Sequence, residues 1–307
     1  MSAATTPEHT GEPVRTRGRA VPVALVVGAA LSLSLSATFV KLADTTASTA
    51  AFLRCAIALL ALLPLAGYEL RRKGRMSPSA CVASVAAGLF LGVDYAMWTA
   101  AILDVGAGIT SVLINVQVIV FPVLCRLIDG RPLSRRFLAC TPLMLAGLAL
   151  AGGLVSADAT SPHPVRGMLL GLAAGVGYSG YLYLNRRSGT HSPGHVVTPV
   201  AIATAAATLA TGVAGVVNGG LTLALPVAAW GWLTALALLG QVISWLMLGA
   251  ATPRMAPSTS GSLLLLQPVL AVGFAMLILG ESPTLVQLGG CAVVVVAVWL
   301  GTVRGRA

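Results

Sequence analysis

Residues 107–150 read AGITSVLINVQVIVFPVLCRLIDGRPLSRRFLACTPLMLAGLAL. Without a gap, this stretch aligns with PSTSGSLLLLQPVLAVGFAMLILGESPTLVQLGGCAVVVVAVWL, residues 257–300, at a constant shift of 150 positions. Apolar segments match one another easily, so the polar matches carry the argument. Gln117 falls on Gln267 within these apolar stretches. The alignment therefore indicates an internal repeat.

The composition excludes a soluble protein. Hydrophobic residues make up 57% of the 307 positions, charged residues 9%, and the mean hydropathy is +0.90. Soluble domains carry roughly 25% charged residues. The net charge of +10 does not indicate nucleic-acid binding, because the basic residues lie at the ends of apolar segments rather than on one soluble face. We therefore expect a lipid bilayer as partner and no nucleic acid.

The apolar segments predict an all-α polytopic membrane protein with ten transmembrane helices, since a spanning helix needs roughly 20 apolar residues. Residues 1–20 form a polar tail that we expect to be disordered and cytoplasmic, and residues 304–307 form a cytoplasmic carboxyl terminus. The ten expected spans are residues 21–42, 47–68, 79–101, 107–128, 136–155, 166–184, 196–217, 227–249, 256–279 and 285–303.

The basic residues predict that both termini lie inside a cytoplasmic membrane. With the amino terminus inside, 16 of the 19 lysines and arginines fall on the cytoplasmic side. An odd number of spans would break this partition. The inner set is Arg15, Arg17, Arg19, Arg71, Arg72, Lys73, Arg75, Arg126, Arg131, Arg135, Arg136, Arg186, Arg187, Arg254, Arg304 and Arg306.

Five spans in each half mean that the two copies enter the membrane with opposite polarity. The charges of the turns agree: residues 126–136 are basic, whereas residues 280–283 contain no basic residue. Inverted repeats are typical of secondary transporters, which bind their solute near the midplane between the halves. The repeat therefore predicts a small-molecule solute as substrate. It leaves open whether the protein is a monomer or a homodimer.

The repeated motifs resemble the paired domains of the EamA family, within the drug/metabolite transporter superfamily. The resemblance covers about residues 20–303, with one EamA-like repeat at 21–155 and a second at 156–303. It departs at Arg131, where the family usually has the glutamate kept here at Glu281, and at residues 115–117, where many members have a proline. The motifs are Phe52-Leu53-Arg54, Ser111…Gln117…Gly130-Arg131-Pro132-Leu133…Gly147 and Ser260…Gln267-Pro268…Gly280-Glu281…Ala292. The resemblance implies ten helices, inward termini, and export or exchange of amino acids, metabolites or drugs.

Two charges lie clearly inside the expected spans, Arg54 and Asp94. Such charges cost roughly 2.5–3.5 kcal/mol on insertion scales. Both lie at similar depth on consecutive antiparallel spans. Two interpretations are open. In one, the residues form a structural ion pair that fixes packing; in the other, Asp94 is a protonatable coupling group or binds a substrate amine.

Further polar and aromatic side chains complete the candidate site. Trp98 shares a helical face with Asp94, whereas Tyr95 is expected to point elsewhere, and Trp98 could equally belong to an interfacial aromatic belt. Ser244 is the repeat partner of Asp94. The candidate substrate-binding and coupling residues are Arg54, Asp94, Trp98, Asn115, Gln117, Gln241, Ser244, Trp245 and Gln267. Their amides could instead only tie helices together, for about 0.6 kcal/mol each.

Glycine spacings predict close helix packing rather than a nucleotide loop. The pattern Gly-xxx-Gly occurs at residues 88–92 and again at residues 167–175, within apolar spans and without a preceding strand.

The sequence favours a secondary carrier and no enzyme. It contains no ATP-binding motif and no cluster of catalytic side chains; the four histidines lie in the tail or loops and the five cysteines are scattered, so we expect no cofactor, catalytic site or metal. Export driven by protons or exchange is the leading interpretation. A facilitative uniporter, a channel-like permease and an intramembrane lipid-modifying enzyme are the alternatives. One acid, one arginine, amides and tryptophans suit a zwitterionic or aromatic amine, such as an amino acid.

Overall fold

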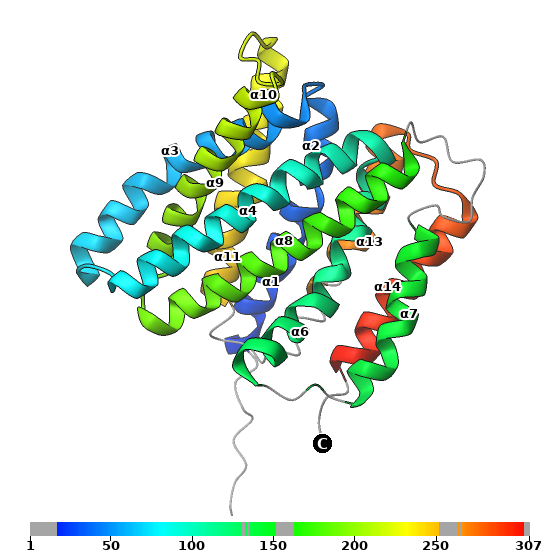
Figure 1. Cartoon of the computed structure of the whole chain (residues 1–307), viewed down its shortest axis with the longest axis horizontal. Helices are drawn as coiled ribbons and strands as arrows, with labels where there is room; N and C mark the ends of the chain where they lie inside the picture. Colours follow the sequence, from blue (N-terminus) through cyan, green and yellow to red (C-terminus); the bar gives the residue numbers. More distant parts are fainter. Residues whose placement is uncertain are drawn as a thin grey trace, which may run out of the picture.

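The computed structural model describes residues 17–130, 133, 135–151, 163–251, 263, 264 and 266–303. Four expectations from the sequence lie outside this part: most of the amino-terminal tail, Arg131, Ser260 and the carboxyl terminus at 304–307. The last residues of the expected span 136–155 and the first of the span 256–279 lie outside it too. Within the described part, every regular element is a helix (Figure 1).

The first half contains the helices expected for spans one to five. Its elements in chain order are α1 (Arg17–Ser34), α2 (Ser36–Leu42), α3 (Ala47–Lys73), α4 (Pro78–Val105), α5 (Ala107–Leu113), the 3₁₀ segment η1 (Ile114–Val116), α6 (Gln117–Asp129) and α7 (Arg135–Ala151).

The second half repeats this order. Its elements are α8 (Pro164–His191), α9 (Val197–Val217), α10 (Val227–Ala237), the π-helical segment η2 (Leu238–Ile243), α11 (Ser244–Ala251), α13 (Leu266–Leu279) and α14 (Leu285–Val303).

Seven helices in the described part are long and apolar enough to cross a membrane, and three shorter apolar helices run over Phe137–Ala151, Leu266–Leu279 and Leu285–Leu300. Some helices continue past the expected spans because they end at glycines rather than where hydrophobicity fades. The helix of the second span, α3, continues to Lys73, and Gly74 follows it with a φ of 79°. Likewise α4 continues to Val105 and stops at Gly106, whose φ is 92°. Positive φ favours glycine, which ends a helix cleanly.

Helix contacts between the halves follow the repeat seen in the sequence. The third span, α4, packs on α8 and α9 of the second half, just as the eighth span packs on α1 and α3 of the first. The fourth span packs on α8, as the ninth packs on α1. Pairs α3–α9, α5–α13 and α7–α14 join equivalent helices of the two halves. This pattern is that of a pseudo-two-fold arrangement, with the α7–α14 pair at one side of the bundle (Figure 1).

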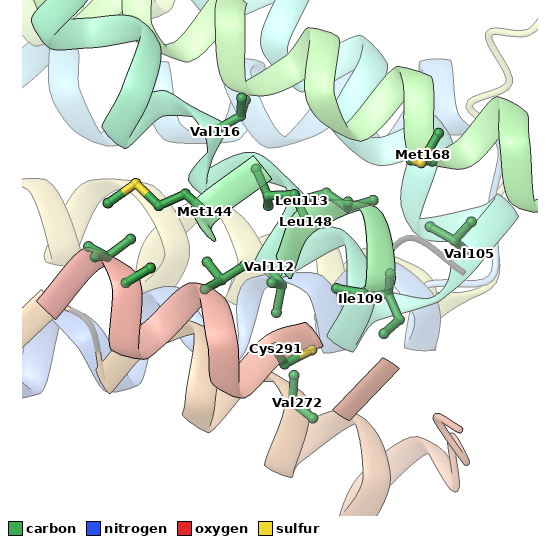
Figure 2. Close-up of a cluster of buried hydrophobic side chains, with 14 residues drawn as sticks. Val105, Ile109, Val112, Leu113, Val116, Met144, Leu148, Met168, Val272 and Cys291 are labelled. Carbon is green, nitrogen blue, oxygen red and sulfur yellow. The ribbon is translucent and has the colours of Figure 1, made fainter. Parts of the chain in front are cut away.

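An apolar cluster anchors the first part of the fourth span. Side chains from α5, including Ile109, Val112 and Leu113, pack with Met144 of α7 and Cys291 of α14 (Figure 2). Burying each large apolar side chain contributes about 1.5–3 kcal/mol in water. In a bilayer the same contacts act through close packing. The cluster therefore fixes α5 to the α7–α14 pair.

Glycines bring neighbouring helices into backbone contact, which confirms the packing predicted from their spacing. On α4, Gly88 lies against Ala203 and Ala206 of α9. On α8, Gly171 lies against Leu113 and Gly175 against Val116. A Cβ atom at Gly171 would be 3.0 Å from the Leu113 side chain, closer than real Cβ contacts allow comfortably.

Substituting Gly175→Ala is expected to lower stability, because the new methyl group collides with Val116 and with the Ile114 carbonyl. Overpacking of this kind costs about 1–3 kcal/mol. Gly189→Ala is the matched control on the same helix, since nothing lies within 4 Å of its Cβ position. Thermal unfolding of purified protein in detergent should show a lower Tm for Gly175→Ala only. Equal Tm values for the two variants would contradict the packing.

Candidate substrate site

A cavity lies between the two halves at the middle of the bundle. Residues from both repeats line it, and they come from the helices of seven different spans. The lining is Leu33, Ser36, Arg54, Asp94, Tyr95, Trp98, Ser111, Ile114, Gln117, Tyr178, Trp245 and Gln267. Its volume is about 60 Å³, room for a few water molecules.

Several helices depart from regular α geometry beside this cavity. The first span breaks at Leu35, next to Ser36, and the fourth span passes through the 3₁₀ segment η1 just before Gln117. The eighth span contains the π-helical segment η2, which holds Gly240 and Gln241. Such breaks free backbone groups for other partners, and they are frequent at functional sites.

Arg54 is held by a buried network at one wall of the cavity. Its Nη2 donates to the Gly240 carbonyl of η2 at 3.1 Å, and its Nε donates to Gln241 Oε1 at 3.3 Å. The guanidinium carbon also lies 3.9 Å from the ring centroid of Tyr95 and 5.2 Å from that of Trp98. Cation–π contacts of this kind contribute about 2 kcal/mol when desolvated. Arg54 therefore joins α3, α4 and the π-helical segment.

Asp94 lies in the same cavity wall with only 1% of its surface exposed, and its Oδ1 has no hydrogen-bond partner. The two salt bridges found in the described part of the chain join Lys73 to Glu69 and Arg166 to Asp104. The ion pair considered for Arg54 and Asp94 is not formed in this structure, because the guanidinium group is directed to η2 and to the two aromatic rings. A buried carboxylate oxygen without a partner is costly, and such a group is typical of a binding or protonation site.

The structure brings six of the nine candidate residues into the cavity wall. These are Arg54, Asp94, Trp98, Gln117, Trp245 and Gln267. Trp98 is 7% exposed, so it is buried in the cavity wall and not placed in an interfacial belt.

The other three candidates lie outside the lining. Gln241 is buried behind Arg54 and donates through Nε2 to Thr204 Oγ1 at 3.0 Å, which joins the eighth span to α9. Asn115 donates to the Ser111 carbonyl of its own span at 2.9 Å. Ser244 donates to the Leu239 carbonyl within the eighth span. Asn115 and Ser244 therefore shape helix geometry, while Gln241 positions Arg54.

Sequence reasoning did not name the other six lining residues as site residues: Leu33, Ser36, Tyr95, Ser111, Ile114 and Tyr178. The expectation that Tyr95 points elsewhere was wrong, because its ring turns toward Arg54 and closes the cavity. Tyr178 packs 6.3 Å from Trp245, ring centroid to ring centroid. Ser36 has a buried hydroxyl without a partner. The available signal was the run of three tyrosines in the glycine-rich sixth span, Tyr178, Tyr181 and Tyr183.

Glu281 closes one end of the bundle, which we call the Glu281 end. Its Oε1 accepts from the Ala107 amide at 2.7 Å, and its Oε2 accepts from the Gly108 amide at 3.1 Å. A carboxylate at a helix amino terminus satisfies free N–H groups and offsets the helix dipole. Gly106 allows the close approach, because a Cβ there would be 2.9 Å from the carboxylate oxygens. Glu281 thus fastens the turn before α14 to the start of the fourth span.

A second glutamate, Glu69 of α3 in the first half, caps the start of α9 in the second half. It lies at the end of the bundle opposite to Glu281, which we call the Glu69 end. Glu69 accepts from the amides of Val196, Val197 and Thr198 at 2.9, 3.0 and 2.7 Å. Lys73 adds a bond to the same carboxylate at 2.9 Å. Neither carboxylate cap was predicted, since each joins residues more than 120 positions apart.

In the described part of the chain, no group of three or more histidine, cysteine, aspartate or glutamate side chains is placed to hold a metal ion. The cavity therefore offers single polar groups, aromatic faces and amides. Such a set binds an organic solute through hydrogen bonds and ring contacts.

Replacing Arg54 with lysine is expected to lower stability by about 2–4 kcal/mol. The charge is kept, but the Gly240 carbonyl and Gln241 lose a forked donor in a buried place. The Tm should fall clearly in detergent. Arg72→Lys is the control, because Arg72 also stacks on a tyrosine, Tyr68, at 4.9 Å, but at an exposed position. An unchanged Tm for Arg54→Lys would show that the buried network contributes little.

Two segments of the chain, residues 21–153 and 165–303, each match the EamA-like transporter family. Together they cover both halves of the described bundle. The chain belongs to the EamA-like transporter family. EamA proteins form part of the drug/metabolite transporter superfamily. The resemblance found in the repeated motifs is thereby confirmed.

A solved structure has a similar fold. A protein described only as "Crystal structure of protein" superposes with a TM-score of 0.63 over 92% of this chain and 97% of its own. The two sequences are 17% identical, so the likeness concerns the fold alone. No curated protein gives a significant sequence match. This EamA protein is therefore a multi-pass helical membrane protein of a transporter family, acting on a small solute in a lipid bilayer.

Proposed function

We propose that this protein is a secondary transporter that moves a zwitterionic metabolite across the cytoplasmic membrane by alternating access. The observation that carries the proposal is the partnerless carboxylate oxygen of Asp94 in a cavity between two equivalent halves. A buried charge in a membrane protein is expensive and usually marks a substrate or ion pathway.

The proposed topology has ten membrane spans and both termini in the cytoplasm. The three shorter apolar helices, α7, α13 and α14, complete the set of ten when the bilayer thins locally around them. The positive-inside rule supports this orientation, because arginines gather at the carboxyl-terminal ends of α3, α6 and α8. The Glu281 end then faces outward and the Glu69 end faces the cytoplasm.

The cavity suits a solute with both an amine and a carboxylate. Asp94 supplies an acceptor for the ammonium group. Arg54 has five N–H donors, of which the described contacts use two, so its remaining donors are free for a carboxylate. Tyr95, Trp98 and Trp245 supply faces for an apolar or aromatic side chain. Gln117 and Gln267, the equivalent glutamines of the two repeats, face the solute from opposite halves.

Alternating access follows from the arrangement of the ends. The contacts of Glu281 with α5, and of α5 with α13, close the proposed outer end. A structure with two equivalent halves has a second state in which the contacts of the halves are exchanged. Opening to the outside then requires the Glu281 contacts to break. Since the cavity holds only about 60 Å³, binding a metabolite also requires the halves to separate.

Proton-driven export or exchange is the proposed energy source. A protonatable Asp94 can carry a proton in one direction and release an amine in the other. Facilitated diffusion by the same cavity is the second candidate, since the geometry of the site is common to both. The two differ in whether a pH gradient drives accumulation.

Flux into proteoliposomes that contain the purified protein tests the proposal. Thermal-shift screening against amino acids, polyamines and cationic drugs first selects the solute. Counterflow of that solute should saturate, and a pH gradient should drive its accumulation. Flux that does not saturate would indicate a pore, and conversion of the solute would indicate an enzyme. Liposomes without protein provide the baseline.

A further inference from the structure

A basic groove lies between the carboxyl-terminal ends of α6 and α8, away from the central cavity. Arg186, Arg187 and Thr190 of α8 line one side, and Asp129 of α6 lines the other. The groove plays no part in the solute pathway described above. Its side chains indicate a ligand other than the transported solute.

The acid of the groove is already engaged, whereas the two arginines make only single contacts: Arg187 lies within hydrogen-bonding reach of the Tyr183 side chain, and Arg186 contacts Cys125. Asp129 Oδ1 accepts from the Tyr183 hydroxyl at 2.8 Å. Arg186 Nη1 donates to the Cys125 sulfur, a weak acceptor, at 3.9 Å. Among the described residues, neither Arg186 nor Arg187 forms a salt bridge. Each guanidinium group has five N–H donors and uses only one of them in these contacts, so the two neighbouring groups match the oxygens of a phosphate group.

Apolar side chains lie directly beside these charges. Leu127 is 76% exposed and Ile128 is 55% exposed, on the last turn of α6. Exposed leucine and isoleucine next to arginines are typical of the level where acyl chains meet headgroups. The partial negative charge at the carboxyl ends of α6 and α8 opposes an anion here, so the guanidinium groups supply the attraction. The combination fits a ligand with an anionic head and an apolar tail.

We propose that this groove binds the phosphate headgroup of an anionic phospholipid in the cytoplasmic leaflet. The phosphate contacts Arg186 and Arg187, while the acyl chains lie along Leu127 and Ile128. Basic pockets between transmembrane helices bind such headgroups on the cytoplasmic side. The assignment to that leaflet rests on the proposed orientation, but binding itself does not depend on transport.

The test measures thermal stability of the full-length protein in detergent with increasing dioctanoyl phosphatidylglycerol. The Tm should rise and saturate, and dioctanoyl phosphatidylcholine should have a clearly smaller effect. R186Q/R187Q should weaken the apparent affinity roughly 10- to 30-fold, because each basic residue near the headgroups contributes about a fivefold change. R71Q/R72Q removes the same charge from the end of α3 and should bind as the wild type does.

Several outcomes would overturn the lipid site. Equal weakening in both double variants would indicate general charge attraction, and absence of stabilisation by phosphatidylglycerol would indicate no site. Inorganic phosphate that stabilises as strongly at equal concentration would indicate a free anion as ligand. If R186Q/R187Q does not purify, R186Q and R187Q are tested singly, and wild-type affinity in both would exclude the groove. None of these results depends on solute flux.

Discussion

Asp94→Asn is expected to abolish uptake driven by a pH gradient, with a loss of at least about 100-fold. Asparagine keeps the size of the side chain but cannot take up or release a proton. It also replaces a charge-assisted contact to a substrate ammonium group, worth about 1.5–3 kcal/mol, with a neutral one. Expression and Tm should not fall, because Asp94 Oδ1 has no partner to lose. Initial uptake rates in proteoliposomes provide the measurement.

Asp104→Asn is the matched control for this experiment. It makes the same chemical change on the same helix, α4, but at a side chain that is paired with Arg166 at 3.4 Å outside the central cavity. Its uptake should remain within about twofold of the wild type, since partly exposed pairs contribute about 0–1 kcal/mol. Normal uptake by Asp94→Asn would remove this residue from the coupling mechanism. Counterflow retained without gradient-driven uptake would support a coupling role in particular.

Glu281→Ala is expected to open the outer end of the transporter. The change leaves the amides of Ala107 and Gly108 without their acceptor. A lost hydrogen bond to a charged group costs about 1.5–3 kcal/mol. The equilibrium should therefore shift by roughly 10- to 100-fold toward outward-facing forms.

Thiol labelling measures this shift. A cysteine placed at Ile114, which lines the cavity, should react faster with a membrane-impermeant reagent added from outside when Glu281 is alanine. The background lacks the five native cysteines. Ser282→Ala, in the same turn, is the control and should leave the rate unchanged. Equal labelling rates with Glu281 and with alanine would refute the closing role of this carboxylate.

Most of the fold could be predicted from the internal repeat in the sequence. The match of Gln117 with Gln267 predicted which spans are equivalent, and both glutamines face the same cavity. Helix ends were less accurate, because hydrophobicity marks the bilayer and not the end of a helix. Gly74 and Gly106 mark the true ends through their positive φ, and neither was used as a signal.

The arrangement of the site was only partly predictable. The positions of Arg54 and Asp94 on consecutive antiparallel spans predict a similar depth, but not the direction in which each side chain turns about its helix. The π-helical segment adds a residue to the eighth span and presents the Gly240 carbonyl to Arg54. No proline or polar run in Leu238–Ile243 announces this change, so an ion pair with Asp94 was considered for Arg54 and the observed network was not predicted.

The two carboxylate caps, formed by Glu69 and Glu281, also could not be predicted from the sequence. Glu69 and Glu281 looked like ordinary charges near helix ends, yet each accepts from amides in the other half. The equivalent of Glu281 in the first repeat is Arg131, which lies outside the described residues. An arginine has no carboxylate that could accept from helix amides, so this position of the first repeat cannot provide the cap that Glu281 provides.

The most direct test is the sidedness of two equivalent turns. Cysteines introduced at Arg135, after α6, and at Ser282, before α14, are labelled in intact cells and in inverted vesicles, again without native cysteines. If the two halves are inverted repeats around one cavity, Ser282→Cys reacts only from outside and Arg135→Cys reacts only from the cytoplasm. Labelling of both positions from the same side would contradict the inverted repeat, and the alternating-access mechanism would fall with it.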